Sequence, residues 1–420
     1  MKGTPSKPPL AALAIIVLAF LSGPPLSCST FSILHHFGSG TDGVSPETPP
    51  IVDSHGNVYG TTGSGGTSDD GTVFELTYTD PSGWTETILH SFDFYNDGSG
   101  LAAGVVMDSS GNLYGSTVSG GPDDSGTVFE LSTNGNDWTL AQLYIGSAGS
   151  MVLDGAGNLY TPLGPGNYKL GAIAELSPQG NSWSYTALYS FCPHSPNCSD
   201  GLSPNSPLAW DAAGNLYGTT LYAGIYPYPT NCASPFGCGV VFKLTPRKGG
   251  AWSYRVLHWF GGFTTDGQLP NGGLVSDGKG NIYGTTSYGG PGFYGGTIFQ
   301  LSPHTAGEWG QAVGYSETQL YTFPDCTQGC GPFGPLVRDN AGNLYGAAGG
   351  GNQSCNGYCG VVYRLSQRRD GSWKYSLLHA FNGSDGNGPN GVTVGNDGNL
   401  YGTTISGGQY NKGVVFQITP

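Results

Sequence analysis

The sequence predicts an all-β protein, a seven-bladed β-propeller of four-stranded antiparallel blades. The first observation is a phrase, Gly-Asn-(Leu/Val/Ile)-Tyr, that occurs seven times at intervals of 46 to 66 residues. Self-similarity at such a period is typical of repeat proteins, whose units bury their apolar faces against their neighbours. The seven copies begin at Gly56, Gly111, Gly157, Gly214, Gly280, Gly342 and Gly398.

The second observation is that each repeat holds four β-like segments. A short apolar run precedes each Gly-Asn phrase, and a phrase such as Gly-Thr-Val-Phe-Glu-Leu (71–76) follows it. A Trp, four further residues and Leu-(His/Tyr)-x-Phe, as in 84–92, complete the unit. These segments are short, rich in β-branched and aromatic residues, and bounded by Gly, Asn, Asp and Pro, which is typical of strands. Composition agrees, because 74 Gly and 29 Pro among 420 residues disfavour helices.

The third observation concerns the two ends of the repeat region. Residues 30–420 divide into seven units of about 56 residues, within the usual range of blade numbers. The region begins with a fourth-strand phrase (34–37) and stops on a third-strand phrase (413–418). We therefore expect residues 31–37 to pair with residues 414–418, which closes the ring and removes two exposed sheet edges. An open solenoid is the alternative.

Residues 1–29 are predicted to be a signal peptide, and residues 30–420 a single propeller domain. Lys2 and Lys7 precede an apolar run at 10–21, which is too short to cross a bilayer and has the layout of a secretory signal. We expect cleavage after Ser29 and a secreted, extracellular or periplasmic protein without a transmembrane segment in its mature chain. Lipid attachment to Cys28, in a lipobox-like context, is the alternative.

The other eight cysteines form four local doublets. An even number of cysteines behind an export signal indicates disulfides, whereas zinc ligation is the weaker alternative because few His lie nearby. Four short local loops are the simple pairing, although two doublets in one blade share a face and could cross-pair. The doublets are Cys192 and Cys198, Cys232 and Cys238, Cys326 and Cys330, and Cys355 and Cys359.

Two sets of acidic residues recur. The Asp-x-x-Gly-Asn turns join the first two strands, and we interpret them as turns closed by their own Asp side chains; calcium loops are the alternative. They contain Asp53, Asp108, Asp154, Asp211, Asp277 and Asp339, with Gly395 in the seventh copy. A second set, Asp-Gly just after the fourth strand, predicts either further turns or a ring of carboxylates at the channel mouth that binds a cation or basic ligand. It comprises Asp42, Asp97, Asp200, Asp266 and Asp385.

Aromatic residues gather in the loops between the second and third strands. Such loops on a rigid scaffold suit stacking on sugars or peptides, but the same rings could instead fasten Gly-rich loops to the blades. The candidate binding residues are Tyr222, Tyr226, Tyr228, Tyr288, Phe293, Tyr294 and Tyr410, with Tyr358 in a similar loop.

No catalytic motif stands out. The His of Leu-His-x-Phe recurs as His35, His90, His258 and His379, but Tyr144, Tyr189 and Tyr321 replace it elsewhere. An interchangeable ring with a polar tip indicates packing with one hydrogen bond and not catalysis. Nucleic acid is excluded as a partner by 14 basic residues against 28 acidic ones and a net charge of −14.

The phrases Gly-Asn-Leu-Tyr-Gly-Thr-Thr and Gly-Thr-Val-Phe-Glu-Leu, in this order, resemble the GloVer tandem repeat of choice-of-anchor bacterial surface proteins. The resemblance covers about residues 31–420. It implies an exported repeat protein and supplies no catalytic residues. The third repeat departs most, with Gly146 in place of Phe and Thr161-Pro162-Leu163 in place of Gly-Thr-Thr.

The leading hypothesis is a monomeric secreted or cell-surface propeller that binds a glycan or protein ligand on the face with the disulfides and aromatic loops. One alternative is a carbohydrate-active hydrolase or lyase that uses the channel-mouth carboxylates. Another is a structural component of the envelope. No cofactor is expected, with calcium as a candidate ion only.

Overall fold

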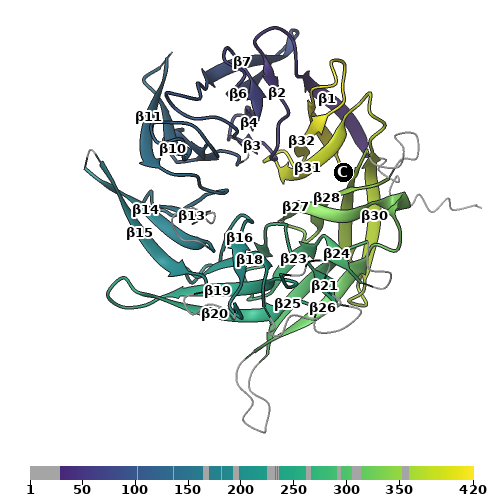
Figure 1. The fold of residues 1–420 in the computed structure, drawn as a ribbon. Coiled ribbons are helices and arrows are strands. Elements are labelled where there is room, and N and C mark those ends of the chain that lie inside the picture. The colour runs from purple at the N-terminus through teal and green to yellow at the C-terminus, as the bar shows by residue number, and fades with distance from the viewer. Residues whose placement is uncertain are drawn as a thin grey trace, which may run out of the picture.

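A computed structural model describes the chain as a closed ring of blades (Figure 1). It describes residues 29–101, 103–135, 137–163, 170–180, 182–192, 198–224, 232, 234, 236–261, 266–290, 295–304, 314–351 and 359–420. Cys28 and the remainder of the predicted signal peptide before Ser29 lie outside these residues.

Seven antiparallel sheets follow one another along the chain, as predicted. Blade 1 is β3 (Ile51–Val52), β4 (Val58–Thr62), β6 (Thr72–Thr79) and β7 (Gly83–Ser91). Blade 2 is β8 (Val106–Met107), β9 (Leu113–Ser116), β10 (Thr127–Thr133) and β11 (Trp138–Ile145). Blade 3 is β12 (Val152–Leu153), β13 (Leu159–Leu163), β14 (Ala172–Gln179) and β15 (Ser182–Ser190). Blade 4 is β16 (Leu202–Pro204) with β17 (Ala209–Trp210), then β18 (Leu216–Tyr222), β19 (Val240–Pro246) and β20 (Trp252–Trp259).

Blades 5 and 6 continue the order, and blade 7 takes its fourth strand from the start of the propeller. Blade 5 is β22 (Val275–Ser276), β23 (Ile282–Thr286), β25 (Thr297–His304) and β26 (Gly314–Thr322). Blade 6 is β27 (Cys330–Arg338), β28 (Leu344–Gly349), β29 (Val361–Gln367) and β30 (Trp373–Ala380). Blade 7 is β31 (Asn387–Val394), β32 (Leu400–Ser406), β33 (Val414–Thr419) and β1 (Thr30–His36). Two short ribbons, β2 (Gly43–Val44) with β5 (Ser64–Gly65) and β21 (Gly267–Gln268) with β24 (Tyr288–Gly289), add to the loops, and Cys326–Gln328 forms one 3-10 turn.

The predicted ring closure is confirmed. Strand β1 pairs antiparallel with β33, from Thr30 opposite Thr419 to His36 opposite Val414. Figure 1 shows this purple strand lying beside the yellow strands of the last blade. Both ends of the propeller therefore share one sheet. The β1–β33 pairing satisfies backbone groups that would otherwise form an exposed edge on each of the two strands.

The core of the molecule lies between blades. Seven clusters of buried apolar residues each combine side chains of two consecutive blades, so one cluster fills each of the seven junctions. At the junction of blades 7 and 1, for example, Phe37, Phe74 and Val415 are fully buried. Each sheet thus packs its two faces against its neighbours, which is why an isolated blade has no core of its own.

A glycine faces a large aromatic ring in the middle of six of the seven blades. Gly60 lies opposite Phe74 in the register, and a Cβ atom at Gly60 would stand 2.6 Å from Phe74 Cζ. Glycine is required here by close approach of the ring. In blade 3 the sizes change together, since Thr161 lies opposite Ala174. This exchange explains how the most divergent repeat keeps the same sheet.

The predicted disulfides are confirmed as local loops. Cys192 binds Cys198, Cys232 binds Cys238 and Cys326 binds Cys330. Blade 4 therefore does not cross-pair its two doublets. Cys359 is also disulfide-bonded, and its expected partner Cys355 lies outside the described residues.

Candidate functional site

The His or Tyr of Leu-(His/Tyr)-x-Phe, which we call the ring position, lies on the outermost strand of every blade. In each blade the register between the third and fourth strands shifts at the Leu just before it, for example between Val73–His90 and Phe74–Ile88. The same shift occurs in the other six blades. A β-bulge redirects the side chains that follow it, so the bulged Leu turns the ring position toward the neighbouring blade.

The five Asp-Gly aspartates bind the ring position of their own repeat. Asp97 Oδ2 lies 2.6 Å from His90 Nε2, and Asp200 Oδ2 accepts a hydrogen bond of 2.7 Å from Tyr189. Each aspartate also accepts the backbone N–H of the residue after the Phe, as Asp97 does from Asp93. The remaining four do so from Gly38, Cys192, Gly261 and Asn382.

This placement corrects the expected ring at the channel mouth. The carboxylates stand beside the outermost strands of five of the seven blades, and those of Asp42 and Asp266 are almost buried. Their hydrogen bonds agree with the turn interpretation. Any ligand of these groups would therefore lie at a blade edge and not on the central axis.

Six of the seven ring positions contact the next blade at a fixed place, the residue four positions before that blade's own ring position. We call this residue the junction partner. Three junctions stack two tyrosines, with ring centroids 3.9 to 5.2 Å apart. The junction between blades 6 and 7 stacks His379 on Phe31. The junction partners in chain order are Phe31, Glu86, Leu140, Tyr185, Tyr254, Glu317 and Tyr375.

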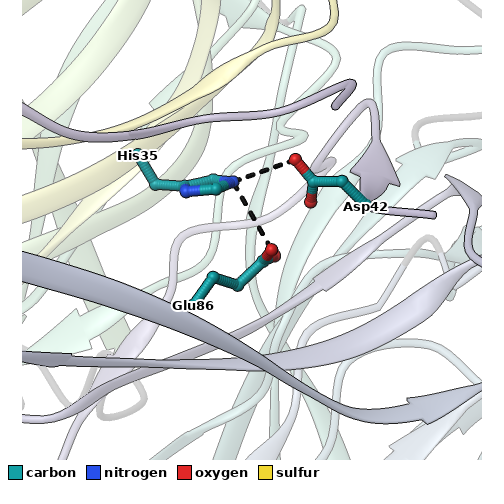
Figure 2. A group of neighbouring side chains, drawn as sticks. All are labelled: His35, Asp42 and Glu86. Carbon is teal, nitrogen blue, oxygen red and sulfur yellow. Dashed lines mark hydrogen bonds and ion pairs between the residues drawn. The ribbon is translucent and has the colours of Figure 1, made fainter. Parts of the chain in front are cut away.

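Two junctions replace the stacked rings with a cluster of His, Asp and Glu. Figure 2 shows the first, where His35 Nε2 lies 3.0 Å from Asp42 Oδ2 and 3.6 Å from Glu86 Oε2. His35 and Asp42 belong to the segment that closes blade 7, whereas Glu86 comes from β7 of blade 1.

The second cluster repeats the first between blades 4 and 5. His258 Nε2 lies 3.6 Å from Asp266 Oδ1 and 3.3 Å from Glu317 Oε2. The side chains of Glu86 and Glu317 are only 13% and 14% exposed. The three ligand-type atoms of each cluster lie within 4.8 Å of one another, and among the described residues only these two groups do so.

Burial and close carboxylates give both clusters unusual electrostatics. Burial, together with the charge of Asp42, raises the pKa of Glu86 well above its usual range. Burial and the charge of Asp266 likewise raise the pKa of Glu317. Burial alone would lower the pKa of His258, but its hydrogen bond with Asp266 and the charge of Glu317 raise it overall. Each cluster is therefore short of positive charge when all its carboxylates are ionised.

A separate groove runs along β20, the outermost strand of blade 4. Its volume is about 500 Å³. The groove is lined by Asp200, Arg255, Trp259 and Tyr315, among others. Trp259 is 42% exposed. The Trp259 indole N–H donates a 2.9 Å hydrogen bond to the Ser199 carbonyl, which fixes the orientation of the ring.

Of the predicted aromatic loop residues, the described ones lie apart from this groove. Tyr288 and Tyr410 are 39% and 44% exposed, and Tyr222 contacts Phe236 edge to face. Tyr226, Tyr228, Phe293, Tyr294 and Tyr358 lie outside the described residues. Among the candidates that the structure describes, Asp200 alone lines the groove.

Sequence reasoning missed both the groove and the His-Asp-Glu clusters, although each contains a residue that departs from the repeat. Trp259 follows a ring position, where Ser91, Ser190 and Ala380 stand in other repeats. Glu86 and Glu317 occupy a position that is aromatic or Leu in the other five. The remaining repeats place His36, Ile145 and Thr322 after the ring position, so Trp259 is the largest side chain there. The buried acids Glu86 and Glu317 depart more clearly from the repeat, because the equivalent residues are apolar or aromatic.

These features define a repeat-built β-propeller with polar sites at its outer blade edges. The Gloeobacter/Verrucomicrobia repeat model matches residues 25–155 and 144–319, and the chain belongs to this repeat family. No curated protein is significantly similar in sequence.

Solved propeller structures are distantly similar. A gluconolactonase from Xanthomonas campestris is 13% identical, with 91% of this chain and 99% of that chain covered and a TM-score of 0.41. A luciferin-regenerating enzyme is 16% identical, with 76% and 91% covered and a TM-score of 0.44. Neither similarity bears on activity. In the described part of the chain, no helix has the length and apolar character needed to cross a membrane.

Proposed function

We propose that the protein is an exported binding module and that a glycan binds in the groove along β20. The groove carries the proposal because it presents a partly exposed indole face, held in place by its own N–H bond, next to an acidic and a basic side chain. Sugar rings stack their C–H faces on aromatic rings, while carboxylate and guanidinium groups bind sugar hydroxyls. Local disulfides and a signal-like leader support an oxidising, extracytoplasmic location.

The hydrolase alternative has less support in the geometry. It needs a pair of carboxyl groups that a substrate can reach. Asp42 and Asp266, which sit next to the two buried glutamates, are 8% and 4% exposed and accept hydrogen bonds from their own turns. The Asp200 carboxylate likewise accepts bonds from Tyr189 and Cys192.

The test is a glycan array followed by pull-down with envelope and matrix polysaccharides. Trp259→Ala should weaken binding at least tenfold, whereas Trp259→Phe, which keeps an aromatic face, should keep most of it. Tyr95→Ala is the matched control, because Tyr95 is 82% exposed and does not line the groove. Binding that survives Trp259→Ala, or the capture of protein ligands alone, would refute the proposal.

A further inference from the structure

The two His-Asp-Glu clusters have no role in the groove, and each spans a blade junction. Their recurrence is informative because the protein supplies internal comparisons. His90 with Asp97 and His379 with Asp385 form the same His-Asp contact in other blades, at 2.6 and 3.0 Å. There the junction partner is Leu140 or Phe31, so the third ligand-type group is missing.

The Glu side chains are costly without a counter-charge. Each approaches an Asp carboxylate, with which it shares a side-chain hydrogen bond, while its second oxygen, Glu86 Oε1 or Glu317 Oε1, is buried without a hydrogen-bond partner in the described structure. Burying a carboxylate oxygen without a partner costs free energy, and a stacked Tyr or Phe fills the equivalent space in four other junctions. Packing alone therefore gives no reason for an acid at this position.

The spacing of the donor atoms fits a small cation. Zinc bonds to His nitrogen and carboxylate oxygen are about 2.0–2.2 Å long, so neighbouring ligands on a tetrahedron are about 3.3–3.5 Å apart. The distances from the His Nε2 to its two carboxylates are 3.0 and 3.6 Å in one cluster and 3.6 and 3.3 Å in the other. Calcium instead takes six to eight oxygens at longer distances, and imidazole suits transition metals.

We propose that each cluster binds one divalent transition-metal cation of the zinc type, through His35, Asp42 and Glu86 at one junction and His258, Asp266 and Glu317 at the other. Water would complete the tetrahedron on the exposed side of the His. Each ion joins two blades, and the first joins the ring-closing segment of blade 7 to blade 1. The proposal is independent of the glycan groove.

The experiment uses the mature chain without a His tag, stripped with a chelator and titrated with Zn²⁺ alone by calorimetry. We expect two ions per chain. Glu86→Gln and Glu317→Gln should each remove one, and the double variant should remove both. Asp97→Asn, at a junction without the Glu, is the matched control and should still bind two.

A wild-type chain that binds no Zn²⁺, or sites that survive both Glu variants, would overturn the proposal. Sites of the latter kind would be adventitious surface histidines, such as His55, which is 83% exposed. Co²⁺ provides a test on the wild-type chain that does not depend on the folding of any variant. Strong visible absorption typical of tetrahedral Co²⁺, reversed by Zn²⁺, is expected, and its absence would contradict the proposed geometry.

Discussion

The ring of Phe31 lies flat against the imidazole of His379, with centroids 3.8 Å apart and an interplanar angle of 5°. Phe31 belongs to β1 and His379 to the outermost strand of blade 6. The closing strand is therefore held by two different contacts, the hydrogen bonds to β33 and a stack on the preceding blade. Phe31 adds ring contacts to Phe381 and Phe416.

Replacing Phe31 with Ala should lower the free energy of unfolding by about 2–3 kcal/mol, less than for a fully buried Phe because Phe31 is only half-buried. The substitution removes the stack on His379 and the apolar surface that Phe31 buries where β1 closes the ring. Urea denaturation monitored by fluorescence measures it. Tyr95→Ala should change the value by less than about 0.5 kcal/mol. Equal losses for Phe31→Ala and Tyr95→Ala would show that the contacts of Phe31 in the closing strand do not stabilise the fold.

A second prediction follows from the close contact between Gly60 and the Phe74 ring on the paired strands β4 and β6. Gly60→Thr should destabilise the protein by about 1–3 kcal/mol because the new side chain meets the Phe74 ring. Phe74→Ala should cost about 3–5 kcal/mol because it leaves a cavity. The double variant imitates Thr161 and Ala174 of blade 3, so its loss should be smaller than the sum of the single losses by about 1 kcal/mol or more.

A double-mutant cycle in urea measures this coupling. Phe129→Ala combined with Gly60→Thr places the two changes in different blades and serves as the control, with additive losses expected. Strict additivity of the Gly60 and Phe74 variants would mean that the size exchange in blade 3 is not a compensation.

The disulfides should contribute modestly and locally. Each of the three described bonds closes a loop of only four or six residues within one connection. A loop of that length is worth about 2 kcal/mol in the chain-entropy account. Reduction should therefore lower the melting temperature but leave the propeller folded at 25 °C, as followed by near-ultraviolet circular dichroism. Complete unfolding on reduction would contradict a core that lies between the blades.

Much of this architecture could be predicted from the repeats, because Gly-Asn-Leu-Tyr and the phrases around it specify strands and turns within one blade. The ring closure by β1 was predictable too, since residues 34–37 supply the fourth-strand phrase that the last repeat lacks. The junction clusters were not, because His35 and Glu86 belong to different repeats and meet only when two blades pack. The groove depends likewise on how the 199–200 loop lies against β20.

The Asp-x-x-Gly-Asn turns follow the predicted chemistry in detail. Asp211 accepts hydrogen bonds from the backbone and side chain of Asn215 and from the Tyr217 hydroxyl. In the seventh repeat, where Gly395 replaces the Asp, Asp397 binds the side chains of Asn399 and Tyr401 instead. The carboxylate is thus retained in the turn from a position two residues later.

These turns should make stability depend on pH. Burial alone would raise the pKa of Asp211, but the bonds from Asn215 and Tyr217 lower it overall, and Asp154 and Asp339 behave alike. A carboxyl whose folded pKa is depressed stabilises the fold above its unfolded pKa of about 3.8 and loses that contribution as the pH falls through the lower folded value. The free energy of unfolding should therefore decline as the pH drops below about 4.

Asp211→Asn tests the origin of this decline. The substitution removes the charge that the Asn215 and Tyr217 donors bind, so it should cost about 1–3 kcal/mol at pH 7. The difference from wild type should be smaller at pH 2.5 than at pH 7, because the protonated fraction of the wild-type carboxyl rises as the pH falls. Asp123→Asn, at an exposed residue, should leave the free energy of unfolding unchanged at both pH 7 and pH 2.5. Urea denaturation at both pH values measures this, and a difference that stays constant between them would rule out titration of the turn carboxylate as the cause.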